Sequence, residues 1–398
     1  MQVNNDKNSV RFLHLSDTHF GVHFALHPKN LNRRAYGELF FQKVNDLINK
    51  SISRHQVDFI IHSGDFFNRS NPPPEIVDRG VQSFQLATRE GIPIFVLPGN
   101  HERSKLPFGL LPFSDNINLF SKPCSFFFKK NGISIKLMGF PYIRENIKRK
   151  FKTLIKKASQ KSSGDFAKKA DYQILVIHQL IEGSCIENFI FRRGANIVSF
   201  LQIPKKFHYI ACGHVHRFQL LYKTRLNPTQ STSKFFLAEQ KDNHQSWYFS
   251  DENGLNSSVF QNPLIIYPGS VERVSFAERN EPKGYIIGHL RFPDNEIQNN
   301  TYEFHQLPAV NMMYLIWDLS ITDLDENINQ TLEKMYKAHL RSSPLHDKKE
   351  NSLTAIFRIK IKSRSYPSPE KLKYLRLEAK RLNIYLTFSL AIKLAQAR

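Results

Sequence analysis

The chain has 398 residues, 41% of them hydrophobic and 12% aromatic, which is enough for one large folded domain and a smaller one. No apolar run approaches the ~18 residues of a membrane span, and the polar start MQVNNDKNSV lacks the apolar segment of a signal peptide. Lys and Arg outnumber Asp and Glu by 56 to 35, so the net charge of +21 favours a polyanionic partner, nucleic acid before an anionic membrane.

The three cysteines show no metal-ligand spacing, and isolated thiols suit packing roles in a reducing cytosol. They are Cys124, Cys185 and Cys212. We therefore expect a cytoplasmic protein, associated with the nucleoid if the source is prokaryotic.

Strands and helices alternate in the first hundred residues. Apolar runs at 10–16, 57–63 and 92–98 predict strands, and helical spacing at 33–54 and 75–90 predicts helices between them. Four later apolar runs predict further strands, at 133–140, 172–179, 208–214 and 264–270. Early alternation followed by strands predicts a layered α/β domain with sheets inside and helices outside.

Two regions interrupt this pattern. Residues 144–170 carry ten Lys or Arg against two acids, which predicts a helix followed by a flexible loop. Its basic residues either form an ordinary solvated face or contact DNA phosphates, and the candidates for that contact are Lys148, Arg149, Lys150 and Lys152. Residues 224–262 are rich in Asn, Gln and Ser and predict an inserted hairpin or mobile loop.

The pattern restarts after residue 305. Apolar runs at 312–320 and 384–390 predict strands, and 325–341 predicts a helix. The run 356–362 alternates apolar and basic residues, which predicts a strand with one charged face. Ser368 followed by Pro predicts a helix N-cap. Residues 305–398 should thus form a second, smaller α/β domain.

Polar side chains follow five predicted strands at the point where each strand ends. They are Asp17 and His19, then Asp65, then Asn100 and His101, then His178, and finally His214 and His216. Taken singly, each has an ordinary structural explanation, as a helix cap, a hydrogen-bonded core histidine or an exposed turn residue. Together they fit a site, because open α/β sheets place their sites at strand carboxyl ends and glycine stands beside three of them.

The donor types in this set indicate a metal centre. Three oxygen donors and four imidazoles suit Mn²⁺, Fe²⁺ or Zn²⁺ better than Ca²⁺. Seven ligands exceed the needs of one ion but fit two ions that share a carboxylate, and such a pair activates a hydroxide for attack at phosphorus. His101 is left over and would face the scissile phosphate, where an imidazole can protonate the leaving oxygen.

In this order and spacing, D-x-H, G-D, G-N-H-E, H and G-H-x-H resemble the calcineurin-like metallophosphoesterase superfamily. The resemblance implies a layered β-sandwich flanked by helices over 9–295. It implies one metal held by Asp17, His19, Asp65 and His216. It implies a second metal held by Asp65, Asn100, His178 and His214, with Asp65 bridging and His101 catalytic.

Three longer strings resemble the SbcD-type nuclease subunit of the double-strand-break repair nuclease–ATPase complex. They are LSDTHFG, GDFFNRSNPPP and YPGSVERVSFAERNEPKGY. The resemblance implies a manganese-dependent DNA exonuclease that also cuts single strands and hairpins in DNA repair. It implies a coiled-coil ATPase partner and a capping domain at 305–398; a homodimer is also open.

Two departures from that family stand out. Relatives often carry His or Asp where this chain has Asn68, and asparagine can hydrogen-bond a phosphate or water but cannot shuttle a proton. Only AIKLAQAR follows the last predicted strand, so the segment that docks the ATPase is short or missing. Two alternatives stay open: a phosphodiesterase or phosphatase for small phosphoesters, and a non-catalytic scaffold that binds DNA ends.

Overall fold

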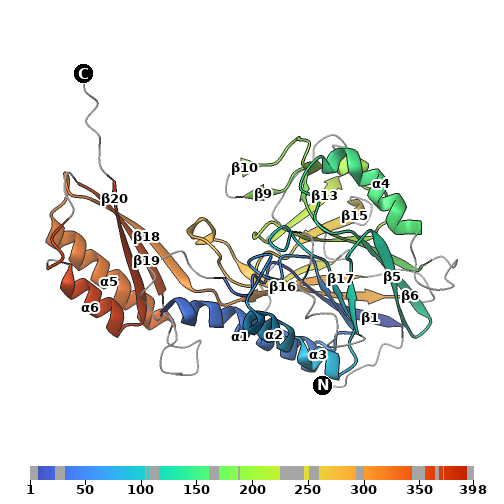
Figure 1. The fold of residues 1–398 in the computed structure, drawn as a ribbon, viewed down its shortest axis with the longest axis horizontal. Coiled ribbons are helices and arrows are strands. Elements are labelled where there is room, and N and C mark those ends of the chain that lie inside the picture. The colour runs from blue at the N-terminus through green and yellow to red at the C-terminus, as the bar shows by residue number, and fades with distance from the viewer. Residues whose placement is uncertain are drawn as a thin grey trace. The chain divides into compact units, whose positions relative to one another are not determined.

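The chain divides into two compact units in the computed structural model (Figure 1). The first comprises the described residues within 1–22, 40–272 and 281–307, and the second those within 23–39, 273–280 and 308–398. The nuclease and capping roles predicted for 9–295 and 305–398 stay predictions. The structure describes residues 8–22, 32–103, 106, 116–160, 170–186, 189–224, 246–250, 260–292, 300–342, 355–363, 367–370 and 372–391.

A seven-stranded sheet forms one half of the first unit, in the order β14-β17-β16-β1-β2-β3-β4. Strands β1 to β4 run parallel, whereas β16 is antiparallel to β1. Parallel strands end at the same edge of a sheet, so the polar residues that follow β1, β2 and β3 are brought together. The bounds are β1 Ser9–Leu15, β2 Phe59–His62, β3 Ile94–Val96, β4 Ile117–Leu119, β14 Ser246–Ser250, β16 Lys283–Arg291 and β17 Thr301–Leu307.

A six-stranded sheet faces the first one, in the order β13-β15-β12-β7-β6-β5. Apolar side chains of both sheets share one core, with Phe12 and Phe59 from the first sheet and Ile174 and Tyr209 from the second. The predicted layered sandwich is therefore confirmed. The bounds are β5 Cys124–Lys130, β6 Ile133–Gly139, β7 Tyr172–His178, β12 Tyr209–Gly213, β13 Gln219–Thr224 and β15 Phe260–Tyr267.

Helices cover the outer faces of this sandwich (Figure 1). Helix α1 (Asn32–Ser53) begins in the second unit, and its residues 40–53 lie on the side of the seven-stranded sheet. The helix predicted at 75–90 is instead two, α2 (Pro74–Gln82) and α3 (Gln85–Arg89). The break falls where Phe84 is buried and stacks on Phe66, with ring centroids 5.3 Å apart.

Helix α4 (Ile147–Gln160) covers the six-stranded sheet. Its buried residues recur at helical spacing, and they are Ile147, Phe151, Ile155 and Ala158. The loop predicted after it falls mainly at 161–169, outside the described residues. None of the helices in the described part of the chain is long and apolar enough to cross a membrane.

The region predicted as an inserted hairpin or loop contributes a strand to the sandwich. Strand β14 pairs with β17 at the edge of the seven-stranded sheet, whereas β13 pairs with β15 in the other sheet. Strand β14 of the insert therefore joins the seven-stranded sheet, whereas the two ends of the insert pair with each other, Thr224 with Phe260. Its residues 225–245 and 251–259 lie outside the described residues.

Short elements connect the long strands. They are β8 Leu180–Ile181, β9 Cys185–Ile186, β10 Phe189–Ile190, β11 Ile197–Val198 and the 3₁₀ helices η2 Phe200–Gln202 and η3 Phe276–Glu278. Four of them make two separate two-stranded sheets, β9 with β10 and β8 with β11.

The second unit is a three-stranded parallel sheet with helices α5 and α6 on one face (Figure 1). Its own core, which includes Trp317, confirms the predicted compact α/β arrangement. Helix α6 begins after Leu372, so the predicted N-cap at Ser368 is wrong: the chain first turns at Pro369–Glu370. The bounds are β18 Asn311–Asp318, α5 Leu324–Ser342, β19 Ala355–Lys362, α6 Lys373–Arg381 and β20 Ile384–Ala391.

Candidate metal centre and active site

Backbone hydrogen bonds tie the loop after β1 to the loop after β2. The N–H of Asp17 donates to the carbonyl of Gly64 over 2.9 Å, and the N–H of His19 donates to the carbonyl of Asp65 over 3.0 Å. The N–H of Phe20 continues this pairing with the carbonyl of Phe66. The two loops therefore run side by side, and the side chains of Asp17, His19 and Asp65 lie close together.

Four of these strand-end residues have left-handed backbone conformations. The φ angles are 53° at Asp17, 44° at His19, 52° at Asp65 and 91° at His214. Each such conformation costs a non-glycine residue on the order of 1–3 kcal/mol, so it persists only where the surrounding structure enforces it. Their concentration at one edge of the sandwich marks this edge as a functional site.

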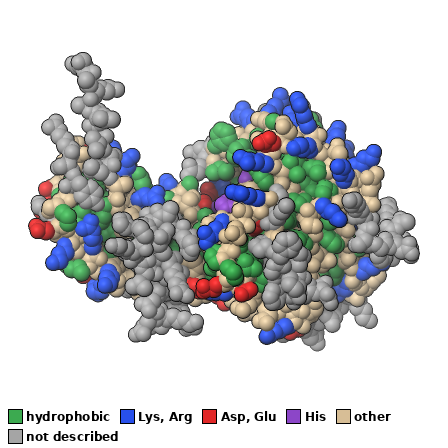
Figure 2. Space-filling view, viewed as in Figure 1, with side chains coloured by type: hydrophobic (Ala, Val, Ile, Leu, Met, Phe, Trp, Pro, Cys, Tyr) green, Lys and Arg blue, Asp and Glu red, His purple; other side chains and the backbone are tan. Residues whose placement is uncertain are grey.

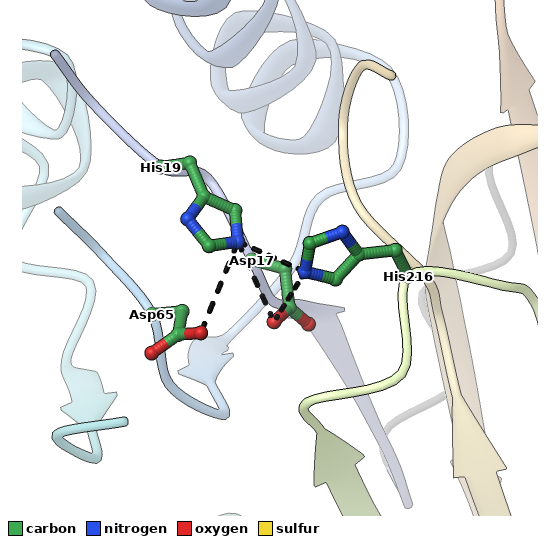
Figure 3. A group of neighbouring side chains, drawn as sticks. All are labelled: Asp17, His19, Asp65 and His216. Atoms are coloured by element: carbon green, nitrogen blue, oxygen red, sulfur yellow. Dashed lines mark hydrogen bonds and ion pairs between the residues drawn. The ribbon is translucent and has the colours of Figure 1, made fainter. Parts of the chain in front are cut away.

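The first group of side chains can hold one cation. One ligand atom from each of Asp17, His19, Asp65 and His216 lies within 4.8 Å of all the others (Figure 3). The Nε2 atoms of His19 and His216 are 3.0 Å apart, and Nε2 of His216 is 3.6 Å from a carboxylate oxygen of Asp17. Lone pairs of imidazoles and carboxylates that converge in this way suit a divalent transition metal.

A second group adjoins the first through Asp65. The side-chain oxygen of Asn100 is 2.9 Å from Nε2 of His178 and 2.7 Å from Nδ1 of His214. The Oδ2 atom of Asp65 is 3.3 Å from Nε2 of His178 and 3.8 Å from Nε2 of His19. The structure thus brings all seven predicted ligand residues together, in two groups that meet at Asp65.

Two glycines leave the space that this packing requires. Gly64 has φ +114°, and a Cβ on it would lie 2.2 Å from Nδ1 of His178. A Cβ on Gly99 would lie 2.1 Å from a carboxylate oxygen of Asp65. Any larger residue at either position would push His178 or Asp65 out of the site.

His101 stands at the open side of the two groups. Its backbone N–H donates to Asp65 Oδ1 over 2.9 Å, and its Nδ1–H donates to the carbonyl of Asn68 over 2.8 Å. Its Nε2 atom is 3.9 Å from Asp65 Oδ2, and its side chain is 36% exposed, whereas that of Asp65 is 2% exposed. Asn68 therefore orients His101 through its backbone; a contact of its side chain with phosphate stays a prediction.

Electrostatics favour a proton in the second group when no metal is bound. Burial alone would lower the pKa of His178, but the charge of Asp65 raises it to about 9. Burial pushes the pKa of Asp65 upwards, yet the neighbouring histidines, His178 foremost, hold it below its usual range. Burial lowers the pKa of His214 to about 3, so that imidazole is neutral and free to act as a ligand.

Glu102 is a supporting residue that the sequence analysis missed. It is buried, and it accepts the backbone N–H of Phe67 over 2.5 Å and that of Gly99 over 2.7 Å. It therefore joins the loop after β2 to the loop after β3. Burial and the charge of Asp65 raise the pKa of Glu102 to about 8, although the two N–H groups oppose this. Its signal in the sequence was the last letter of G-N-H-E.

Lys283 is a second missed residue, and it explains part of the 267–285 string. It is fully buried at the start of β16, and its Nζ donates to the carbonyl of His216 over 2.8 Å and to the Ser270 hydroxyl over 2.9 Å. The Ser16 hydroxyl contacts the neighbouring Gly269 carbonyl at 3.4 Å and also bonds to the Asp17 carboxylate. Buried Lys283 thus contacts His216 of the first group directly. It is linked to Asp17 indirectly, through the 269–270 segment and the Ser16 hydroxyl.

The basic residues predicted to contact DNA lie apart from this cluster. They are exposed on α4, outside its buried face, and comprise Lys148, Arg149, Lys150 and Lys152. Figure 2 shows Lys and Arg side chains gathered over the part of the first unit where Figure 1 places α4. The structure does not bring these residues to the strand ends.

A two-sheet sandwich with His, Asp and Asn side chains gathered at its strand ends is the architecture of a metallophosphoesterase. The family model described as "Calcineurin-like phosphoesterase" matches residues 10–218, and the chain belongs to this family. The resemblance predicted from the sequence motifs is therefore confirmed.

Several named proteins are similar to this chain in sequence. A "DNA double-strand break repair protein Mre11" of Methanococcus maripaludis is 28% identical over 260 residues, which are 62% of this chain and 64% of that protein. A protein of the same name from Sulfurisphaera tokodaii is 28% identical over 214 residues, 52% of this chain and 49% of the relative. The chain thus spans about half to two thirds of these relatives' length.

One relative covers more of the chain. The "Uncharacterized metallophosphoesterase YhaO" of Bacillus subtilis is 22% identical over 334 residues, which are 81% of this chain and 65% of that protein. A match of that length extends beyond the 209-residue region 10–218 of the family model.

The contacts of Lys283 predict a role in metal affinity. Lys283→Met would leave the His216 carbonyl and the Ser270 hydroxyl without this donor, so the first group should bind Mn²⁺ roughly 10- to 100-fold more weakly. Calorimetric titration of the metal-free protein measures this affinity. Lys130→Met, which removes a lysine paired with Asp58, is the matched control. An unchanged Mn²⁺ affinity in a folded Lys283→Met protein would contradict the prediction.

The raised pKa of His178 predicts proton release on metal binding. Below pH 9 this imidazole is protonated in the metal-free protein, and a ligand imidazole must be neutral, so Mn²⁺ uptake at pH 7.5 should release about one proton from it. Titrations in buffers of different ionisation enthalpy count the released protons. The affinity should fall as the pH decreases from 9. A binding enthalpy that is independent of the buffer would argue against a protonated His178.

Proposed function

We propose that the protein is a metal-dependent nuclease that acts on DNA ends in double-strand-break repair, as an exonuclease and as an endonuclease on single strands and hairpins. The observation that carries this proposal is the pair of donor groups that meet at the buried carboxylate of Asp65. The names of the Mre11 relatives direct the proposal to DNA, and the net charge of +21 agrees with a polyanionic substrate.

The donor set fits two divalent ions, with Mn²⁺ proposed for both. Asp17, His19, Asp65 and His216 would hold one ion, and Asp65, Asn100, His178 and His214 the other. Bound there, the ions would supply charge neutralisation at the scissile phosphate and acidify the attacking water. The mixture of imidazole nitrogens with carboxylate and amide oxygens is the chemical reason for this choice.

His101 would supply the proton that the leaving oxygen needs. Its Nδ1–H bond to the Asn68 carbonyl fixes the ring, so that Nε2 remains for the substrate. A positioned imidazole can act as a general acid and give up a proton as the phosphorus–oxygen bond breaks. Its partial exposure, beside buried neighbours, suits a group that meets a phosphodiester from outside.

The basic face of α4 would bind DNA away from the reacting phosphate. Four basic residues are exposed on this helix outside its packed face: Lys148, Arg149, Lys150 and Lys152. Such contacts add affinity without reading sequence, as expected for an enzyme that recognises ends. A coiled-coil ATPase subunit and a second copy of this chain are the protein partners that the resemblance implies, and the proposed compartment is the cytoplasm.

Hydrolysis of small phosphoesters is the second candidate. The family match and the match over 81% of the chain to a protein named only as a metallophosphoesterase fit either substrate. The exposed lysines of α4 have no role in binding a small ester, and this favours DNA. A non-catalytic scaffold is disfavoured because all seven donor residues are present and assembled.

Digestion of an end-labelled linear duplex in Mn²⁺ tests the proposed function. The parent protein should shorten the labelled strand, and EDTA should abolish this cleavage. His101→Ala should lower turnover by roughly 10²- to 10⁴-fold with both ions retained, because His101 is not a ligand. Asn100→Ala, one residue earlier, should lose metal and activity together. Near-normal rates in a metal-loaded His101→Ala protein would refute the role of His101.

The same preparation should be assayed on a mononucleotide ester. Hydrolysis of that ester without any cleavage of DNA would overturn the nuclease proposal in favour of the phosphatase. Metal content, measured by elemental analysis for each variant, separates loss of a ligand from loss of a proton donor.

Salt dependence tests the role of α4. If all four of its basic residues contact phosphates, replacing them with Ser should flatten the log–log slope of duplex affinity against salt by up to about 3.6. The measurement is fluorescence anisotropy in EDTA, where no cleavage occurs. The control replaces four lysines that are exposed on helices of the second unit: Lys334, Lys337, Lys373 and Lys380. A slope equal to the control's would leave the α4 residues as a solvated face.

A further inference from the structure

The three-stranded sheet of the second unit has helices on one face only. Side chains of β19 alternate, so Phe357, Ile359 and Ile361 are buried towards the helices. Arg358 and Lys360, between them, point to the opposite side. We call the solvent-accessible part of that side the open face. Tyr314, Ile316 and Ser389 are exposed on it, and Lys360, Lys362 and Thr387 are half-buried.

The strand register places these residues in rows across the sheet. Ile316, Lys360 and Ser389 form one row, because Ile316 pairs with Lys360 and Lys360 with Ser389. Tyr314 and Thr387 flank Arg358 in the next row. An aromatic and an aliphatic side chain thus stand along β18, beside a basic column on β19.

Exposure shows how far the open face extends. Tyr314 is 40% and Ile316 52% exposed, although Trp317, the next residue on β18, is only 2% exposed. The other end of the same side is closed, since Ile356 is 1% exposed. The guanidinium of Arg358 lies 4.2 Å above the ring of Phe276, within the same unit, and marks the boundary.

The charge on this side is mainly positive. Three basic residues of β19 stand along it, and Asp318 at the end of β18 pairs with Lys362 at 3.5 Å. Among the described residues, Lys360 makes no ion pair. On the helices of this unit, Lys337 pairs with Glu333 and Arg381 with Glu378. The open face therefore retains charge for a polyanion.

We propose that the open face binds single-stranded DNA. Unpaired bases would stack on Tyr314 and pack on Ile316, and the phosphates would follow Arg358, Lys360 and Lys362. These basic residues are two positions apart on a strand, so they recur about every 6.6 Å along one line. Exposed aromatic side chains next to a basic track are the features that proteins use for single strands. The choice of DNA rests on the proposed function.

A single strand fits this surface better than a duplex does. The bases of a duplex are stacked inside the helix, so its backbone could use the charges but not Tyr314 or Ile316. Exposed Tyr314 and Ile316 beside the unpaired charge of Lys360 fit a ligand whose base and phosphate are both bound. The predicted endonuclease action on single strands would supply such a substrate.

Anisotropy of the full-length chain in EDTA, with a labelled single-stranded 20-mer and the matching duplex, tests this inference. Lys360→Ser with Lys362→Ser should flatten the single-strand salt slope by about 1.4. Tyr314→Ala should weaken single-strand binding roughly 5- to 100-fold without changing the slope, and duplex binding should change little. The control is Lys334→Ser with Lys373→Ser, which removes equal charge from the helices.

Single-strand affinity and slope equal to the control's would overturn the proposal, and so would equal losses for both DNA forms. Tyr314→Phe keeps the ring and should retain binding; a loss as large as that of Tyr314→Ala would show that stacking is not the cause. If the parent fails to cut DNA in Mn²⁺ but the variants still lose single-strand binding, the nuclease proposal fails and this one stands. If the parent cuts DNA in Mn²⁺ but every variant binds single strands as the parent does, this proposal fails and the nuclease proposal stands.

Discussion

The site depends on one buried carboxylate, that of Asp65. It lies between two groups of histidines, and a buried carboxylate is tolerated only where cations or strong donors surround it. Without metal, His178 carries the compensating positive charge, which is why the pKa of His178 is raised and that of Asp65 lowered. Metal ions can replace that proton because the same nitrogen and oxygen atoms already converge. The absence of a side chain at Gly64 and Gly99 makes this convergence sterically feasible.

The surrounding shell holds a geometry that the local backbone does not favour. Left-handed conformations at Asp17, His19 and Asp65 are maintained by hydrogen bonds between neighbouring loops. Glu102 and Lys283 extend this shell, since each is buried and each links segments that are distant in sequence. The strain and the buried charges suggest a division of tasks: the sandwich core provides stability, and its strand ends hold the reactive geometry.

Binding and chemistry are assigned to different surfaces. Buried side chains that can hold a metal ion gather at the strand ends, whereas α4 and the open face carry exposed or half-buried basic side chains. The two basic surfaces also differ from each other. Helix α4 offers charge alone on its exposed side, and the open face adds Tyr314 and Ile316. On this basis α4 is the proposed site of general DNA affinity, and the open face is the proposed site for unpaired nucleotides.

The sequence alone predicted the fold class, the strand ends and the seven candidate donor residues, because continuous apolar runs and closely spaced His and Asp are local patterns. It also predicted the alternating strand of the second unit. It did not place the N-terminus of α6, because the burial of Leu372 in the unit's core outweighs a local cap signal at Ser368. Nor did it identify Lys283, since a lysine far along the chain gains its role only when β16 lies beside β1. Tertiary structure decided which loops meet, and hence which atoms share Asp65, because contacts between segments up to two hundred residues apart follow from sheet order and not from spacing.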